Sequence, residues 1–361
     1  MPAYPGTERE QRVGPDELDR LVTAIFSGCG MRDDDAALVA ASLVSADLQG
    51  VHSHGVYRVP GYVARLTDGA VDPGGRPRIA RDAGATLVID GGNAMGQVAV
   101  TFAMRAAIER ARTTNVAAVA VGGSNHCGAM AQYVRMAIAE KMIGIATTNA
   151  LPIMAPWGGL DSIVGINPLA IGIPTAEEPP FVIDTSFAAA ANGKIRVYQQ
   201  KGLPIPEGWA FDAEGRSTTD PARAALMHPV GGYKGVGLAV AMGLLSTVLS
   251  GAAYGSELGT RETGPAPGRD GQFVVALSPG AFQDPDLVGG RVDKVIGELR
   301  SSRPAEGVAR IYSPGEVEAD TEAEYRAAGI PLNDETLEGL RTAAGRLGVA
   351  ATLVDAISPG G

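Results

Sequence analysis

The spacing of apolar residues predicts helices and strands that are intermixed along the whole chain. In residues 14–30 the apolar side chains recur at helical spacing on one face: Leu18, Leu21, Val22, Ile25 and Phe26. The sequence also predicts helices over residues 34–48, 97–112, 129–142, 287–302 and, as a last surface helix, 334–348. Short apolar runs bounded by Gly, Pro or Asp predict strands over residues 86–92, 115–126, 143–150, 169–175, 181–186 and 271–279. Turn signals predict loops over residues 198–232.

The uncharged stretch 235–256 is long enough to cross a bilayer. It is rich in Gly, Ala and Ser, however, and follows Lys234 directly. We therefore predict a buried helix of a water-soluble protein and expect no membrane partner.

Intermixed helices and strands are typical of the α/β or mixed α+β class. The glycines form no GxGxxG sequence, which argues against the Rossmann fingerprint for dinucleotides. With 361 residues, 45% of them hydrophobic, the chain can bury a sizeable core.

Charge and cysteine content exclude several classes of protein. The net charge of −10 provides no general attraction for nucleic acid or anionic lipid. The two cysteines, Cys29 and Cys127, cannot build a disulfide framework. Because the first residues are also polar and charged, we expect no secretory signal and a cytoplasmic location.

The four histidines all fall in polar or glycine-rich connections: His52, His54, His126 and His228. His54 shares the segment HSHGVYR with Arg58. An arginine can bind a carboxylate through two parallel hydrogen bonds, and an imidazole can exchange a proton with a carbonyl oxygen that receives a hydride. The pair therefore suggests a 2-oxo acid reductase, with Asp184 as a candidate for fixing the imidazole tautomer and raising its pKa.

Two glycine turns are candidate ligand sites. Residues 231–235, GGYKG, offer backbone N–H groups and Lys234 at a predicted helix start, which suits phosphate. Residues 313–316, SPGE, form a tight turn that lets the backbone approach a ligand. No metal site is expected, because His52 and His54 lack a supporting cluster of ligands.

Six segments in order resemble the type 2 malate/L-lactate dehydrogenase family of NAD(P)-dependent oxidoreductases. They are GVHSHGVYRVPGYVARLTDG, GGSNHCGAMAQYVRMA, APWGG with GINPLAIGIPT, VIDTS through NGK, GGYKGVGLAVAMGLL and YSPGE. The family includes sulfolactate and ureidoglycolate dehydrogenases, diketogulonate reductase and Δ1-piperideine-2-carboxylate reductase.

The resemblance implies a non-Rossmann fold of the malate/L-lactate dehydrogenase type, with a central cofactor domain. It implies N-terminal helices over 1–50, a substrate and dimerisation domain from 51–122 and 317–361, and an NAD(P)-binding domain over 123–316. It also implies a homodimer.

The resemblance further assigns roles to individual residues. His54 would be the proton donor and acceptor, with Asp184 and His126 as further catalytic residues. Ser53 and Arg58 would bind a small carboxylate-bearing substrate. NADPH or NADH would contact seven positions: Ile183, Thr185, Ser186, Lys234, Pro314, Gly315 and Glu316.

The chain departs from the family pattern at four positions. Gln49 replaces an arginine and Cys127 replaces a phenylalanine. Phe187 and Ala188 stand where the family commonly has Thr and Ser, which removes two hydroxyls beside the expected cofactor.

The sequence thus predicts an NAD(P)H-dependent reductase of a 2-oxo acid or a cyclic 2-imino acid. One alternative is a malate-, lactate- or sulfolactate-type dehydrogenase that works oxidatively. Another is a non-catalytic binding protein on the same fold.

Overall fold

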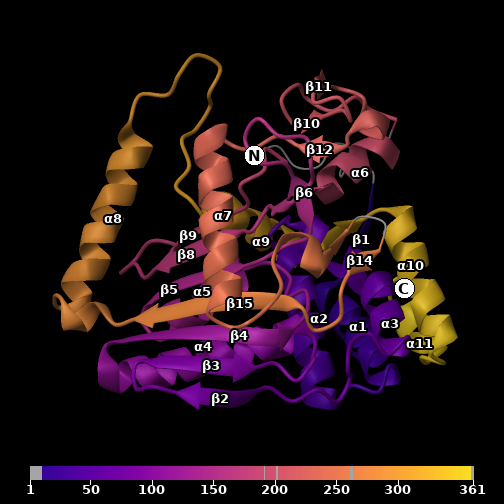
Figure 1. Cartoon of the computed structure of the whole chain (residues 1–361), viewed down its shortest axis with the longest axis horizontal. Coiled ribbons are helices and arrows are strands. Elements are labelled where there is room, and N and C mark those ends of the chain that lie inside the picture. Colours follow the sequence, from indigo (N-terminus) through magenta and orange to yellow (C-terminus); the bar gives the residue numbers. More distant parts are fainter. Residues whose placement is uncertain (1–9, 191, 201, 261–262, 359–361) are drawn as a thin grey trace.

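The computed structural model describes residues 10–190, 192–200, 202–260 and 263–358. Its central element is a seven-stranded sheet, drawn in Figure 1. In spatial order the strands are β2 (Arg78–Asp82), β3 (Thr86–Asp90), β4 (Val116–Ser124), β15 (Asp270–Leu277), β5 (Ile143–Thr148), β8 (Leu169–Ile173) and β9 (Phe181–Thr185). Strands β3 and β4 are parallel, and the other neighbours in this sheet are antiparallel. This mixed sheet differs from the parallel sheet of a Rossmann domain, as the missing fingerprint predicts.

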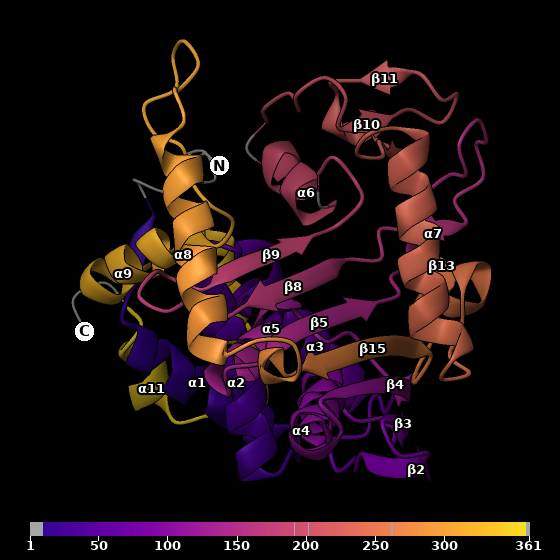
Figure 2. The same ribbon diagram turned by 90° about the vertical axis from the view of Figure 1, so that its left-hand side faces the viewer.

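Two helices, α4 (Gly96–Thr114) and α5 (Ala131–Ala139), pack against this sheet and share one apolar core with it. Glycines allow close contact: a Cβ atom at Gly144 would lie 2.8 Å from the Cα of Val134, and one at Gly172 would lie 2.7 Å from Ile138. Helices α7 (Tyr233–Val248) and α8 (Pro285–Ser301) run across the strands near their opposite ends (Figure 2).

A second core joins the two ends of the chain. It includes residues of α1 (Pro15–Gly28), α2 (Asp33–Leu48), α3 (Val59–Thr67), α9 (Glu316–Ala328) and α10 (Asp334–Arg346), and α11 (Ala351–Asp355) packs against it. Strand β1 (Gln11–Val13) pairs with β16 (Ile330–Leu332). The apolar face predicted within residues 14–30 is confirmed, since all five of its side chains are buried. Helices α9 and α11 were not predicted.

The third core lies around residues 152–242. It includes residues of β6 (Pro152–Met154), β7 (Val164–Gly165) and α6 (Asn192–Gln200), as well as a small sheet of β10 (Ala210–Phe211), β11 (Ser217–Thr218) and β12 (Leu226–Met227). The prediction of loops over 198–232 is therefore wrong in part, because two-residue strands carry no periodic signal. Strands β13 (Gly259–Thr260) and β14 (Gly264–Pro265) form a separate hairpin.

Helix α7 corrects the prediction of a buried helix over 235–256. Its buried side faces the fold through small residues such as Gly235, Ala239 and Gly243. The other side remains open, with Leu238 50% and Val248 65% exposed. Among the described residues no helix combines the length and apolarity needed to span a bilayer. The division of the chain at residues 50, 122 and 316 stays a prediction.

Candidate active site

The segment between α2 and α3 brings three predicted site residues together. It forms two short 3-10 turns, η2 (His52–His54) and η3 (Val56–Arg58). The Oγ of Ser53 lies 3.0 Å from the Nδ1 of His54. The Nε of Arg58 donates to the Ser53 carbonyl oxygen at 2.7 Å. Among the described residues no side chain or carbonyl accepts from the two terminal nitrogens of Arg58, so they are available for a carboxylate.

The predicted site residue His126 joins this group from the loop between β4 and α5. Its ring stacks on that of His54, with 5.8 Å between the ring centroids and 14° between the planes. The fold thus brings His54, Arg58 and His126 to one half-buried recess although 68 residues separate Arg58 from His126.

Tyr62 of α3 completes the group and was missed from the sequence. Its hydroxyl lies 2.6 Å from the Nδ1 of His126, and Gln97 donates to the same hydroxyl oxygen at 3.3 Å. Burial raises the pKa of Tyr62 to about 12, so the hydroxyl keeps its proton. Because the Nδ1 of His126 also accepts the Gly128 N–H at 3.3 Å, this nitrogen carries no proton and the hydroxyl donates to it. A neutral His126 therefore carries its own proton on Nε2. In the sequence, Tyr62 looks like one more apolar residue of a short helix.

Burial and the positive charge of Arg58 keep both histidines neutral. Burial, with Arg58 second, lowers the pKa of His54 to about 3. Burial also lowers the pKa of His126 well below 6.5, with further contributions from Arg58, His54 and Arg65. The expected rise in the His54 pKa is therefore wrong.

Asp184 does not contact His54 in the described structure. Its carboxylate accepts the backbone N–H of Ala131 at 2.7 Å, at the start of α5. The residue is exposed near the end of β9, yet desolvation by the protein atoms around its carboxyl raises its pKa to about 6 despite the backbone donors. The aspartate therefore caps the start of the helix that follows His126 and makes no hydrogen bond to the imidazole that it was expected to orient.

The residues predicted to bind a coenzyme form one continuous run, with Ile183, Thr185 and Ser186 at the end of β9. On one side of this strand, the N–H of Val182 donates to the Pro314 carbonyl at 3.2 Å. Gly315 has a φ of 91°, and an added Cβ atom would lie only 3.1 Å from the Val182 backbone. Glycine is thus required for this close approach.

The run continues beyond β9 to the start of α7. The N–H of Ala189 donates to the His228 carbonyl at 2.7 Å, and Val230 donates to Phe187 at 2.9 Å. Gly231 and Gly232 then adopt positive φ angles, and Lys234 lies exposed in the first turn of the helix. Backbone donors beside an exposed lysine fit the phosphates of NAD(P)H.

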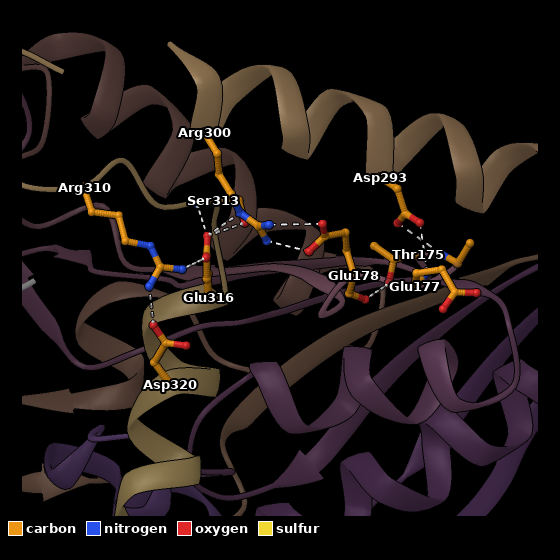
Figure 3. A network of polar contacts seen from close by, with 10 residues as sticks. Thr175, Glu177, Glu178, Asp293, Arg300, Arg310, Ser313, Glu316 and Asp320 are labelled. Atoms are coloured by element: carbon orange, nitrogen blue, oxygen red, sulfur yellow. Dashed lines mark hydrogen bonds and ion pairs between the residues drawn. The ribbon is translucent and has the colours of Figure 1, made fainter. Parts of the chain in front are cut away.

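Glu316 takes part in a polar network rather than pointing to solvent (Figure 3). Its carboxylate accepts from the Ser313 backbone at 2.9 Å and pairs with Arg300 and Arg310. Arg300 also binds Glu178 through two hydrogen bonds of 3.0 and 2.6 Å. The side chain of Glu316 therefore closes the 313–316 turn and ties it to Arg300 of α8.

Three of the four replaced family positions are buried, namely Cys127, Phe187 and Ala188. Phe187 is 7% exposed and belongs to the third core, so its ring does not project into the coenzyme run. Cys127 is also buried, next to Met130. Gln49 bonds to Ser45 on its own helix, and His228 stacks on Phe211. In the described part of the chain, no group of three or more His, Cys, Asp or Glu residues could hold a metal ion.

Comparisons with known proteins agree with this architecture. A family model described as malate/L-lactate dehydrogenase matches residues 13–341. The chain is 35% identical to a malate dehydrogenase of Pyrococcus abyssi, over 95% of this chain and 96% of the relative. It is 30% identical to a Δ1-pyrroline-2-carboxylate/Δ1-piperideine-2-carboxylate reductase of Pseudomonas putida, over 93% and 98%.

Solved structures give the same result. Sulfolactate dehydrogenase from Methanocaldococcus jannaschii superposes with a TM-score of 0.88 at 34% identity, covering 96% of this chain and all of that one. Malate dehydrogenase from Entamoeba histolytica gives a TM-score of 0.90 at 29% identity, covering 94% and 99%. The chain therefore belongs to the malate/L-lactate dehydrogenase family, whose members here are dehydrogenases and reductases.

Proposed function

We propose that this protein is an NAD(P)-dependent oxidoreductase that interconverts a small 2-oxo acid and its 2-hydroxy acid, or a cyclic 2-imino acid and its amino acid. The observation that carries the proposal is the stacked pair of His54 and His126 beside the free end of Arg58. A cation that can hold a carboxylate thus lies beside two groups that can exchange or donate a proton.

The run from Pro314 through β9 to Lys234 would hold the coenzyme, which as NAD(P)H would supply the hydride for reduction and as NAD(P)⁺ would accept it in oxidation. Arg58 would bind the substrate carboxylate with its two terminal nitrogens, because its Nε is already used by Ser53. His126, with its proton on Nε2, would donate a hydrogen bond to the substrate. His54 would exchange the proton with the carbonyl oxygen, or with nitrogen for an imine.

The negative charge of a bound substrate would change the protonation of His54. In the free protein His54 is neutral, which suits it to take the hydroxyl proton when a 2-hydroxy acid is oxidised. A carboxylate bound to Arg58 offsets the positive charge that lowers the His54 pKa. The imidazole then takes up a proton more readily, as the reduction of a 2-oxo or 2-imino acid requires.

We also propose that a second copy of the chain covers the open side of α7, giving a homodimer. The exposed residues of this side are apolar and uncharged: Leu238, Leu244, Leu245, Val248 and Leu249. Leu245→Glu should then shift the mass measured by analytical ultracentrifugation to that of a monomer. A wild-type chain that sediments as a monomer over a range of concentrations would contradict this.

The function can be tested by mixing the purified protein with NADH or NADPH and a panel of acids. The panel contains pyruvate, oxaloacetate, sulfopyruvate and Δ1-piperideine-2-carboxylate for reduction, and the hydroxy acids with NAD(P)⁺ for oxidation. We expect the absorbance of reduced nicotinamide to change with at least one acid and with none of the corresponding esters. Coenzyme binding by calorimetry without turnover of any acid would favour the non-catalytic alternative.

A further inference from the structure

A buried carboxylate lies directly behind the segment that carries Ser53 and His54. Asp47, near the end of α2, is 1% exposed. Its Oδ1 lies 2.7 Å from the Nδ1 of His52, and its Oδ2 accepts the backbone N–H of Val56 at 2.7 Å. A carboxylate can only accept here, so His52 carries a proton on Nδ1. One side chain thus holds the residues on both sides of Ser53 and His54.

The loop is shaped around this carboxylate. A Cβ atom added to Gly55 would lie 2.0 Å from the Oδ1 of Asp47, far inside the contact distance of real atoms. The φ of Gly55 is −88°, which any residue can adopt. Glycine is therefore needed at position 55 for space and not for backbone freedom.

His52 is supported on its other side by the C-terminal part of the chain. Its ring stacks on Tyr325 of α9, with 6.0 Å between centroids and 27° between planes. Tyr325 is itself buried, and the guanidinium of Arg12 lies 5.2 Å from the centre of its ring. The chain between positions 52 and 56 therefore has fixed contacts from α2 and α9, and Arg12 of β1 supports the contact from α9.

We propose that Asp47 and His52 are positioning residues for proton exchange at His54. The inference rests on the proposed function and adds two residues to which that function assigns no contact with substrate or coenzyme. By holding positions 52 and 56, the pair fixes the backbone between them, so that the imidazole of His54 stacks on His126 and Ser53 meets Arg58. A pair that acts in this way affects the reaction only through His54.

A double-mutant cycle with Asp47→Asn and His54→Ala tests this. The amide has one oxygen where the carboxylate has two, so it cannot accept from both His52 and Val56. We expect kcat to fall on the order of 10²-fold, as a small misplacement of a reacting group does, with an unchanged coenzyme dissociation constant. In the His54→Ala background the same substitution should change kcat little, since its effect passes through His54.

Two further variants test whether the effect on kcat comes from the contact between Asp47 and His52. His52→Phe keeps a ring on Tyr325 but removes the donor to Asp47, and it should show the same dependence on His54. Asp35→Asn changes another buried carboxylate of α2, which binds Arg32 at 2.8 Å away from the loop, and should leave kcat unchanged.

The outcomes separate the two proposals. If Asp47→Asn lowers kcat by the same factor with or without His54, the pair does not act through His54 and this inference fails. Full kcat in either Asp47→Asn or His52→Phe would also overturn it. Full activity of His54→Ala alone would instead overturn the proposed role of His54.

Discussion

Two regions of this protein bury ionisable side chains beside arginines, with opposite results. In the active-site recess, burial and Arg58 act in the same direction, and the pKa of His54 falls to about 3. At the 313–316 turn, burial alone would raise the pKa of Glu316. The Ser313 N–H, Arg300 and Arg310 outweigh that effect, and the pKa lies below its usual value. The first region keeps its histidines uncharged, and the second keeps its carboxylate charged.

The difference lies in whether the neighbouring charge opposes or balances the buried group. Arg58 disfavours a second positive charge on His54, and its own positive charge in the recess is not balanced by an anion among the described residues. A substrate carboxylate would supply that anion. Arg300 and Arg310 already balance the negative charge of Glu316. The turn therefore needs no further ion, and its ion pairs stabilise the fold. The comparison predicts that changes in the recess alter catalysis and that changes at the turn alter stability.

The largest effect is expected from His54→Ala. Loss of one acid–base residue should lower kcat by roughly 10²–10⁴-fold, with coenzyme affinity unchanged because the proposed coenzyme run lies elsewhere. Steady-state kinetics and calorimetry measure the two quantities. If His54→Ala turned over normally and His126→Ala were inactive, the roles of the two histidines would have to be exchanged.

The direction of the His54 shift also fixes the pH dependence. For oxidation the neutral imidazole is needed, so kcat/KM should stay constant from about pH 8 down to about pH 5 and fall only as pH approaches the lowered pKa. For reduction the protonated form is needed, and kcat/KM should rise as pH falls. An oxidation profile that declines with a midpoint near 6.5 would show that His54 is not shifted.

The same shift links stability to pH. The unfolded imidazole binds a proton near pH 6.5 and the folded one near pH 3. The free energy of unfolding should therefore keep its full value, as far as His54 is concerned, above pH 6.5. It should decrease as the pH falls toward 3. His54→Gln should reduce this decrease in urea denaturation measured at several pH values. His126 contributes in the same direction, so the single variant should remove only part of it.

Arg58→Lys should produce the next largest effect. A lysine keeps the charge but cannot present two parallel donors to a carboxylate. We expect kcat/KM to fall by a factor on the order of 10–100, equivalent to weakening a charge-assisted pair by ~1.5–3 kcal/mol. The loss should appear mainly in the KM of the acid. An ester turned over as well as its acid by the wild type would refute carboxylate binding here.

At the 313–316 turn, Glu316→Gln should cost about 2 kcal/mol of unfolding free energy, because charge-assisted bonds to a buried group are lost. Asp320→Asn is the matched control, since this carboxylate is 55% exposed and binds the same Arg310 at 3.1 Å. An exposed pair contributes little, so that variant should stay within about 0.5 kcal/mol of wild type. Equal losses in both variants would remove the distinction between the buried and the exposed carboxylate.

The sequence predicted most of the long elements, because their apolar periodicity reports burial on one face. It also singled out His54, Arg58 and His126 through the resemblance, and the fold brings these three residues together. It placed Asp184 beside His54, where the structure shows no hydrogen bond between them, and it missed the contact of Asp47 with His52. Asp47 lies five residues before His52 with no recognisable spacing, whereas Asp184 ends an obvious strand.

The sequence also failed to predict the pKa of His54, the open side of α7 and the strands of two residues. The lowered His54 pKa depends on burial and on the distance to Arg58, which only the fold supplies. The open side of α7 is as apolar as a buried one, so its composition could not distinguish a core helix from one with an exposed apolar side. Strands of two residues, such as β10, are set by their neighbours rather than by their own pattern.

The smallest effect is expected from Tyr62→Phe, which tests how the recess orients a neutral imidazole. The ring remains, but His126 loses the donor that keeps its Nδ1 an acceptor, and only the weaker 3.3 Å contact from the Gly128 N–H is left. The proton on Nε2 is then less firmly placed, and kcat/KM should fall by about 1 kcal/mol, or roughly fivefold. Tyr254→Phe is the control, because the Tyr254 hydroxyl is buried with no partner among the described residues. If both variants behaved alike, Tyr62 would serve packing only, and the proton on Nε2 of His126 would not depend on the Tyr62 hydroxyl.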